Sequence, residues 1–226
     1  MNSQGQSIQN EPLYNLIKQP YAVQPAVPWP EGPADDKRPL SGIKVLELAR
    51  AIAAPTIGRV LSALGATVIR VSSATNTELP ITLVDGCLGK ISVDINLKTF
   101  EGRKTLLKLI EDADVFIDGY RPAVLEHLGF GRDAVFGLVD KRDKGIIYCQ
   151  ENCYGWKGPW IHRPGWAQIS DAVGFPTLIS MIWPLLMYQC SLQALDLVLD
   201  GLTVSRRHTS SLAQMRTTCE LPLSKR

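Results

Sequence analysis

The chain lacks several features that mark specialised protein classes. Its 226 residues hold 24 lysines and arginines against 22 acidic residues, so the net charge of +2 provides no basic excess for nucleic-acid binding. Its five cysteines are odd in number and none are in C-x-x-C spacing, and a chain of this length can form a core without disulfides. The absence of a disulfide framework favours a reducing compartment inside the cell.

Targeting and membrane signals are also scarce. Residues 1–30 are polar and rich in proline, without a basic stretch followed by an apolar core, so no signal peptide is expected. The C-terminal residues do not form a Ser-Lys-Leu peroxisomal address. One apolar run, 173–190, contains Gly174, Pro176 and Pro184, which disfavour a membrane span. We therefore expect a cytoplasmic protein without membrane contact.

From residue 43 onward, apolar runs alternate with helical patterns. The predicted strands cover residues 43–48, 67–71, 91–95, 115–117 and 146–149. The predicted helices cover residues 55–64, 100–111, 122–128 and 165–173. Pro55 and Pro122 suit first helical turns, Gly65 suits a helix end, and Thr99 suits an N-cap. Strands separated by helices of this length predict an α/β fold, a Rossmann-like parallel sheet of βαβ units.

Composition divides the chain into three parts. Residues 1–38 are rich in proline and show little periodicity, which predicts an extended arm. Residues 39–173 carry the alternating strands and helices and form the predicted α/β domain. Residues 174–226 differ in composition and are expected to be a divergent tail.

Six different short motifs follow one another through the predicted domain. They are Pro-Leu-Ser-Gly-Ile at 39–43, Leu-Gly-Ala-Thr-Val-Ile-Arg-Val at 64–71, Leu-Lys-Thr-Phe-Glu-Gly-Arg at 97–103, Gly-Tyr-Arg-Pro-Ala-Val-Leu at 119–125, Glu-Asn-Cys-Tyr-Gly-Trp at 151–156 and Arg-Pro-Gly-Trp at 163–166. This ordered set resembles CoA-transferase family III, the family of carnitine and bile-acid CoA-transferases. The residues at 151–156 are similar to those of the fungal branch of the family.

The resemblance implies transfer of CoA from an acyl-CoA donor to a carboxylic acid acceptor. An Asp carboxylate of the enzyme would attack the thioester, giving an anhydride and then an enzyme thioester. CoA would be a substrate rather than a permanently bound cofactor, and no metal is implied. The resemblance also implies an interlocked homodimer. Similarity to the fungal branch implies a role in secondary metabolism.

Binding CoA requires cations and free N–H groups for the phosphates, and apolar surface for the adenine ring and the pantetheine chain. The candidate CoA contacts, taken from family positions and from strand ends, are Arg50, Ile52, Ala53, Ser73, Asn96, Leu97, Lys98, Gly119, Tyr120, Arg121 and His127.

Each of these candidates also has a structural explanation. Arg50 and Lys98 fit exposed cations, Tyr120 fits a core residue with its hydroxyl at the rim, and His127 fits a surface histidine. Cys149 and Cys153 are four residues apart with only one histidine nearby, which makes a metal site a poor interpretation.

The nucleophile is not identifiable, because residues from 174 onward match nothing in the family. Asp196 and Asp200 lie at a suitable distance but within a helical pattern, and Asp171 fits a polar contact, so the catalytic residue stays unknown. A racemase is disfavoured, because Gly165 precedes Trp166 rather than His-Asp. Three hypotheses stay open: an active transferase, an apparently truncated CoA-binding remnant without the nucleophile, and a product that folds poorly.

Overall fold

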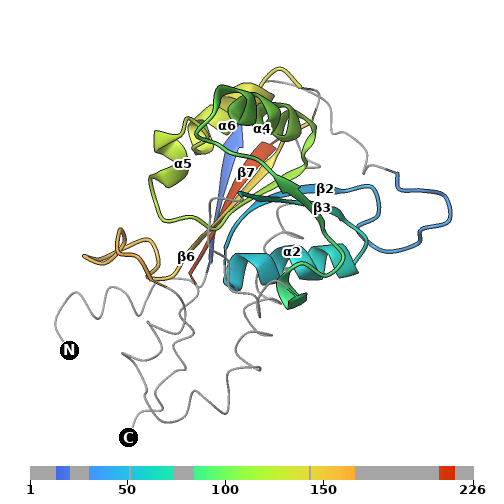
Figure 1. The fold of residues 1–226 in the computed structure, drawn as a ribbon, viewed down its shortest axis with the longest axis horizontal. Coiled ribbons are helices and arrows are strands. Elements are labelled where there is room, and N and C mark those ends of the chain that lie inside the picture. The colour runs from blue at the N-terminus through green and yellow to red at the C-terminus, as the bar shows by residue number, and fades with distance from the viewer. Residues whose placement is uncertain are drawn as a thin grey trace, which may run out of the picture.

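The described part of the chain is built around one mostly parallel sheet. The computed structural model describes residues 14–20, 31–50, 52–73, 84–142, 144–165 and 209–216. Its strands follow the order β1-β7-β6-β5-β2-β3-β4 (Figure 1). All neighbouring pairs from β7 to β4 are parallel. Strand β1 lies at one edge of the sheet and pairs antiparallel with β7. The predicted α/β class with a Rossmann-like parallel sheet is confirmed.

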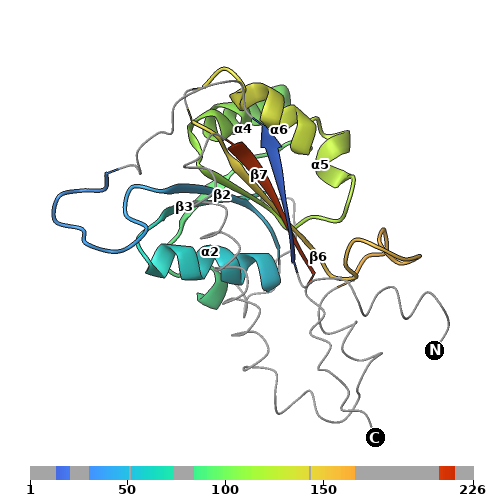
Figure 2. The same cartoon turned by 180° about the vertical axis from the view of Figure 1, so that it is seen from behind.

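Helices cover both faces of this sheet. The strands are β1 Tyr14–Pro20, β2 Lys44–Leu48, β3 Thr67–Ser72, β4 Ile91–Asp94, β5 Val115–Asp118, β6 Ile147–Asn152 and β7 Thr209–Arg216. The helices are α2 Ala53–Ala63, α4 Phe100–Asp112, α5 Val124–His127 and α6 Arg132–Val139. Helix α2 lies on one side of the sheet, and α4, α5 and α6 lie on the other (Figures 1 and 2). None of the helices in the described ranges is long and apolar enough to cross a membrane.

The central strands have two buried faces. On β5, Val115 and Ile117 pack toward α2, whereas Phe116 packs toward α4 and α6. The rings of Phe116 and Tyr148, from neighbouring strands, stack with their centroids 5.1 Å apart. Burial on both faces explains why the sequence shows continuous apolar runs here rather than alternation.

The predicted helix ends are confirmed at two positions. Gly65 has φ +106°, and it follows α2 in a Schellman motif: its N–H donates to Ser62 O (3.0 Å), and Ala66 N–H donates to Leu61 O (3.0 Å). Thr99 caps α4, because its Oγ1 accepts from Gly102 N–H at 3.1 Å.

The helix predicted from Pro122 was wrong in its start and length. Val124 N–H donates to Arg121 O (3.2 Å), and Ala123 has φ 71° and ψ −5°, the angles of the third residue of a type II turn. A left-handed residue cannot continue a helix, so α5 has only the four residues Val124–His127.

Three elements were not predicted from the sequence pattern. Helix α6 is short and contains the exposed Gly137, which lowers helix propensity, so packing of its buried residues decides its formation. Strands β1 and β7 come from the predicted arm and tail; β1 pairs with β7, and β7 pairs with β6. The three-part division of the chain stays a prediction. The predicted helix beyond residue 165 and the apolar run 173–190 lie outside the described residues.

A buried ion pair lies between α2 and the sheet. Lys90 Nζ lies 2.6 Å from Glu47 Oε2, and both side chains are fully buried. Lys90 Nζ also donates to Pro55 O at 2.7 Å. A Cβ on Gly58 would lie 1.9 Å from Glu47 Oε2, so α2 needs a glycine where it crosses this carboxylate. Burial lowers the pKa of Lys90, and Glu47 opposes that shift.

Lys90→Ala should destabilise the fold strongly, because it leaves the Glu47 carboxylate buried without this cation. We expect a loss of about 3–5 kcal/mol in the free energy of unfolding, measured by urea denaturation. The double variant Glu47→Leu with Lys90→Met should recover most of that loss. Equal instability of the single and double variants would contradict this account.

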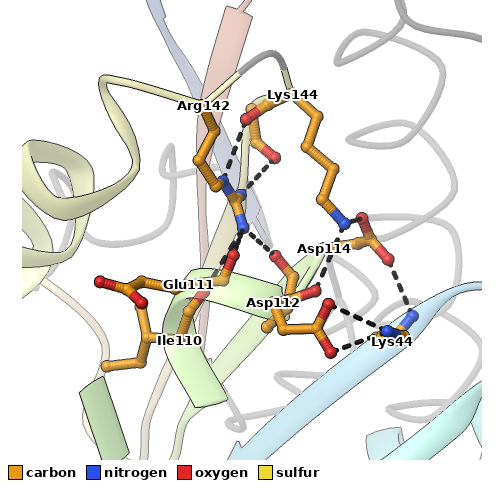
Figure 3. Close-up of polar contacts among 9 residues, drawn as sticks. Lys44, Ile110, Glu111, Asp112, Asp114, Arg142 and Lys144 are labelled. Atoms are coloured by element: carbon orange, nitrogen blue, oxygen red, sulfur yellow. Dashed lines mark hydrogen bonds and ion pairs between the residues drawn. The ribbon is translucent and has the colours of Figure 1, made fainter. Parts of the chain in front are cut away.

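At the amino-terminal ends of the parallel strands, the Arg142 side chain caps the C-terminal end of α4. Its guanidinium donates to the carbonyls of Glu111 (2.7 Å) and Ala113 (2.9 Å), and to that of Gly145 at 2.9 Å (Figure 3). The last carbonyls of a helix have no partner within the helix, so a cation there satisfies them.

Ion pairs tie the same corner to β2. Lys44 Nζ lies 2.7 Å from Asp112, and Lys144 Nζ lies 2.7 Å from Asp114, whose other oxygen accepts from Lys44 N–H at 2.9 Å (Figure 3). The hydrogen bond from Lys44 holds the pKa of Asp112 below its usual value. The end of α4 and the start of β2 are therefore joined by one polar cluster.

Arg142→Ala should lower the free energy of unfolding by about 3 kcal/mol, because several carbonyls lose a charged donor together. The neighbouring Lys141→Ala serves as a matched control at an exposed position and should change it by less than about 0.5 kcal/mol. Thermal and urea unfolding of the two variants check the difference, and equal stabilities would show that the cluster contributes nothing.

Candidate functional site

A cavity of about 370 Å³ opens at the carboxyl ends of the central strands. It is bounded by the residues that follow β2, β5 and β6. Its lining residues are Arg50, Ile52, Ala53, Gly119, Tyr120, Arg121, Val124, Glu151, Asn152, Cys153, Arg163, Pro164 and Gly165. In open α/β sheets this edge, beyond the carboxyl ends of the strands, is where ligands bind.

The structure brings part of the predicted site together in this cavity. Arg50 and Ile52 come from the turn between β2 and α2, Ala53 begins α2, and Gly119, Tyr120 and Arg121 come from the turn after β5. These two turns are far apart in the sequence and meet because β2 and β5 are neighbouring parallel strands.

The other predicted residues do not line the cavity. Ser73 follows β3, and residues 96–98 follow β4, so they lie further along the same edge of the sheet. Lys98 is exposed. His127 is exposed on α5, where its Nδ1 contacts the carbonyl oxygen of Ala123.

Sequence reasoning left seven lining residues out of the predicted site. They are Val124, Glu151, Asn152, Cys153, Arg163, Pro164 and Gly165. Every one of them belongs to a motif on which the family resemblance rests, so these motifs could have identified them as site residues. The periodicity of the sequence could not show that the segment after β6 folds back beside the turn after β5.

Gly119 allows the two turns to meet. A Cβ at this position would lie 2.7 Å from the Cβ of Ala54 and 2.9 Å from that of Ala49, closer than side chains approach. The N–H of Gly119 donates to Leu48 O at 3.0 Å, which joins the exits of β2 and β5. A larger residue would push the start of α2 away from β5.

Asn152 organises the loop that forms the far wall. Its Nδ2 donates to Gly155 O (2.6 Å) and to Ile161 O (3.1 Å), which closes the loop on the end of β6. Tyr154 packs edge-on against Trp160, with ring centroids 5.6 Å apart. The Arg163 guanidinium lies 5.0 Å from the centre of the Trp160 ring. This packing holds Arg163 at the cavity.

The motif around residues 96–103 has a structural explanation of its own. Asn96 Oδ1 accepts from Lys98 N–H at 3.0 Å, and the Asn96 carbonyl accepts from Thr99 N–H at 3.1 Å. A Cβ on Gly102 would lie 2.0 Å from that carbonyl oxygen, so the motif needs a glycine there. These contacts shape the start of α4 and do not by themselves indicate a ligand.

Charge in the cavity wall favours an anion. Arg50, Arg121 and Arg163 line the cavity, and Glu151 is the acidic residue among the described lining residues. Burial raises the pKa of the Cys149 thiol on β6 to about 12, which leaves it unreactive at neutral pH. Within the described ranges, no three His, Cys, Asp or Glu residues group in a way that would hold a metal ion. Asp171, Asp196 and Asp200 lie outside those ranges.

A second cavity, of about 490 Å³, lies beside the first. It is lined by Pro122, Glu126, Gly131, Arg132, Asp133, Ala134, Gln150 and Trp156. Tyr120 and Arg121 line the first cavity, whereas Pro122 and Glu126 line the second. The segment from 119 to 126 therefore forms part of the wall of both.

Gly119→Ala should displace α2 and cost about 1–3 kcal/mol of stability through overpacking. Gly137→Ala is a matched control, because that glycine is exposed in α6 and nothing lies within 4 Å of its added Cβ. The control should stabilise the protein by about 1 kcal/mol. Thermal unfolding of both variants tests the opposite signs, and a neutral Gly119→Ala would contradict the close contact.

Comparison with known proteins places these features in one family. The sequence pattern of CoA-transferase family III matches residues 40–181. The acetyl-coenzyme A transferase nodX of Hypoxylon pulicicidum is 50% identical over 163 residues, 71% of this chain and 28% of that protein. An acyl-CoA transferase of Gibberella moniliformis is 41% identical over 169 residues, 74% of this chain and 30% of that protein. The chain thus spans less than a third of the length of these two fungal relatives.

Solved structures agree with this assignment. A Mycobacterium tuberculosis protein superposes with a TM-score of 0.67 at 28% identity, covering 83% of this chain and 55% of that one. A CAIB/BAIF family protein from Brucella suis gives a TM-score of 0.61 at 24% identity over 80% of this chain and 52% of that one, and supports the fold alone. Because the family pattern covers more than half of the sequence, the chain belongs to CoA-transferase family III.

Proposed function

We propose that this chain binds CoA in the cavity at the carboxyl ends of β2, β5 and β6. There it serves a transferase that moves CoA from an acyl-CoA donor to a carboxylic acid acceptor. The observation that carries this proposal is that two groups of predicted CoA contacts, far apart in the sequence, line one cavity. They are Arg50, Ile52 and Ala53 in the first group and Gly119, Tyr120 and Arg121 in the second. Membership of CoA-transferase family III supports the reaction class.

The wall of the cavity suits the different parts of CoA. Arg50, Arg121 and Arg163 provide charged donors for phosphate oxygens. Ile52, Ala53 and Val124 add apolar surface for the pantetheine chain or the adenine ring, and Tyr120 adds an aromatic ring. CoA is a long molecule, and further contacts along the same edge of the sheet would involve Ser73, Asn96, Leu97 and Lys98. Those four residues and His127 stay predicted contacts outside the cavity wall.

The chemistry proposed is that of the family. A carboxylate attacks the acyl-CoA thioester, forming an enzyme anhydride and releasing the CoA thiolate. That thiolate then attacks the enzyme carbonyl, releasing the donor acid and leaving an enzyme thioester. The acceptor carboxylate repeats the sequence in reverse, leaves as the new acyl-CoA and restores the free enzyme carboxylate. Asp196 and Asp200 are outside the described residues, and no role is assigned to either.

The setting proposed for this reaction is the cytoplasm of a fungus, with a homodimer as the working assembly and secondary metabolism as the source of the acyl groups. The two fungal relatives support the choice of organism group. The alternative is a CoA-binding chain that transfers nothing, and catalytic assays rather than binding assays separate the two.

Arg121→Ala should weaken CoA binding by about tenfold at low salt, because a charged donor to a phosphate is lost. Lys104→Ala is the control, since Lys104 is an exposed cation on α4 that does not line the cavity, and it should leave the affinity unchanged. Isothermal titration calorimetry of CoA into the whole chain gives both affinities. Equal losses in the two variants would place CoA elsewhere.

Assays of CoA exchange between an acyl-CoA and a free acid complete the test. Binding together with exchange supports the transferase, and loss of exchange in Asp196→Asn would then assign the nucleophile. Saturable binding without exchange favours the CoA-binding alternative. Absence of both overturns the proposal.

A further inference from the structure

A buried carboxyl group lies beneath the segment that separates the two cavities. Asp118 ends β5 with only 3% of its surface exposed. Its Oδ1 accepts from Tyr120 N–H at 3.0 Å. Its Oδ2 accepts from Tyr148 OH at 3.1 Å and from Gln150 Nε2 at 3.2 Å. The two oxygens therefore bond to the turn after β5 and to two side chains of β6.

These partners connect Asp118 with both cavity walls. Tyr120 lines the first cavity, and the backbone N–H that Asp118 accepts belongs to that residue. Gln150 is also buried and lines the second cavity. Tyr148 OH in addition lies 3.4 Å from Phe130 O, and the next residue, Gly131, lines the second cavity. One carboxylate thus fixes the turn after β5 and a side chain of β6 together.

This arrangement costs stability at neutral pH. Burial raises the pKa of Asp118 from 3.8 to about 6, and the hydrogen bonds from Tyr120 N–H, Gln150 and Tyr148 lower it only in part. Glu126 on α5 raises it further by repulsion. A carboxyl whose folded pKa is raised contributes stability below its unfolded pKa, and that contribution is lost as the pH rises through about 6.

We infer that Asp118 is a positioning residue of the CoA site, whose ionised carboxylate holds the backbone of Gly119, Tyr120 and Arg121 in the geometry that binds CoA. This inference rests on the proposed function. The carboxylate does not touch the ligand. It keeps Tyr120 N–H directed inward, so that the side chains of Tyr120 and Arg121 stay at the cavity wall. A carboxyl group that is buried at a cost in stability, with hydrogen bonds to a cavity-lining turn, indicates a role other than packing.

Asp118→Asn tests the inference, because the amide has nearly the same shape and no charge. At pH 7.5 we expect this variant to bind CoA about tenfold more weakly than the wild type while melting no lower. At pH 5 the ratio of the two dissociation constants should approach one, because the wild-type carboxyl is then protonated. Comparing the two proteins at each pH cancels the titration of CoA itself.

The control is Asp140→Asn, an exposed carboxylate just after α6, which should match the wild type at both pH values. Equal CoA affinity of wild type and Asp118→Asn at pH 7.5 would overturn the inference. A variant that loses affinity and melting temperature together would also overturn it, because that result describes a purely structural residue.

A second readout separates this inference from the proposed function. With selective ¹⁵N-tyrosine labelling, the Tyr120 amide should shift with a midpoint near pH 6 in the wild type and not in Asp118→Asn. If neither protein binds CoA, the proposed function fails and the positioning role in CoA binding fails with it. The tyrosine titration then still shows whether Asp118 holds the turn. A Tyr120 amide that does not titrate would overturn the anchoring role whatever the binding result.

Discussion

The close contact of the Gly119 backbone with Ala49 and Ala54 is the constraint on which the site depends. Neighbouring parallel strands end at the same edge, so β2 and β5 deliver their following turns to one place. Whether those turns form a shared cavity depends on how closely they approach. A Cβ on Gly119 would lie 2.7 Å from the Cβ of Ala54, so small residues on both sides allow the approach. Arg50 and Arg121, 71 positions apart in the sequence, reach the same cavity as a result.

The two edges of the sheet differ in what their polar groups do. At the amino-terminal ends of the strands, Arg142 donates to carbonyls at the end of α4, and Lys44 and Lys144 form ion pairs with Asp112 and Asp114. At the carboxyl edge, Asp118 is buried at a cost, and Ala123 takes a left-handed conformation with φ 71°. Strain and buried charge of this kind concentrate at functional sites, where surrounding packing holds them in place. The contrast supports the carboxyl edge as the working edge of the molecule.

Family membership supports the class of reaction, whereas the described structure supports the place where CoA would bind. The match over residues 40–181 establishes the family, and the cavity provides a location with cations and apolar surface. The relatives with matching sequence are more than three times as long as the matched region, so the reaction itself stays a proposal for this chain. The cavity, by contrast, is lined by described residues of this chain, and variants of those residues test its role directly.

The sequence by itself determined the α/β class, most strands, and the ends of α2 and α4, because these depend on local patterns: apolar runs, a glycine after a helix and a threonine before one. The family resemblance also selected Arg50, Ile52, Ala53 and residues 119–121 as candidate CoA contacts, and these residues line the first cavity. The tertiary structure decided the rest. Helix α6 and the pairing of β7 with β6 depend on packing and hydrogen bonds between distant segments. The turn at Pro122 places Ala123 in a left-handed conformation, which this residue type does not predict. The place of Arg163 at the cavity depends on a loop closed by Asn152, and no local pattern encodes where such a loop returns.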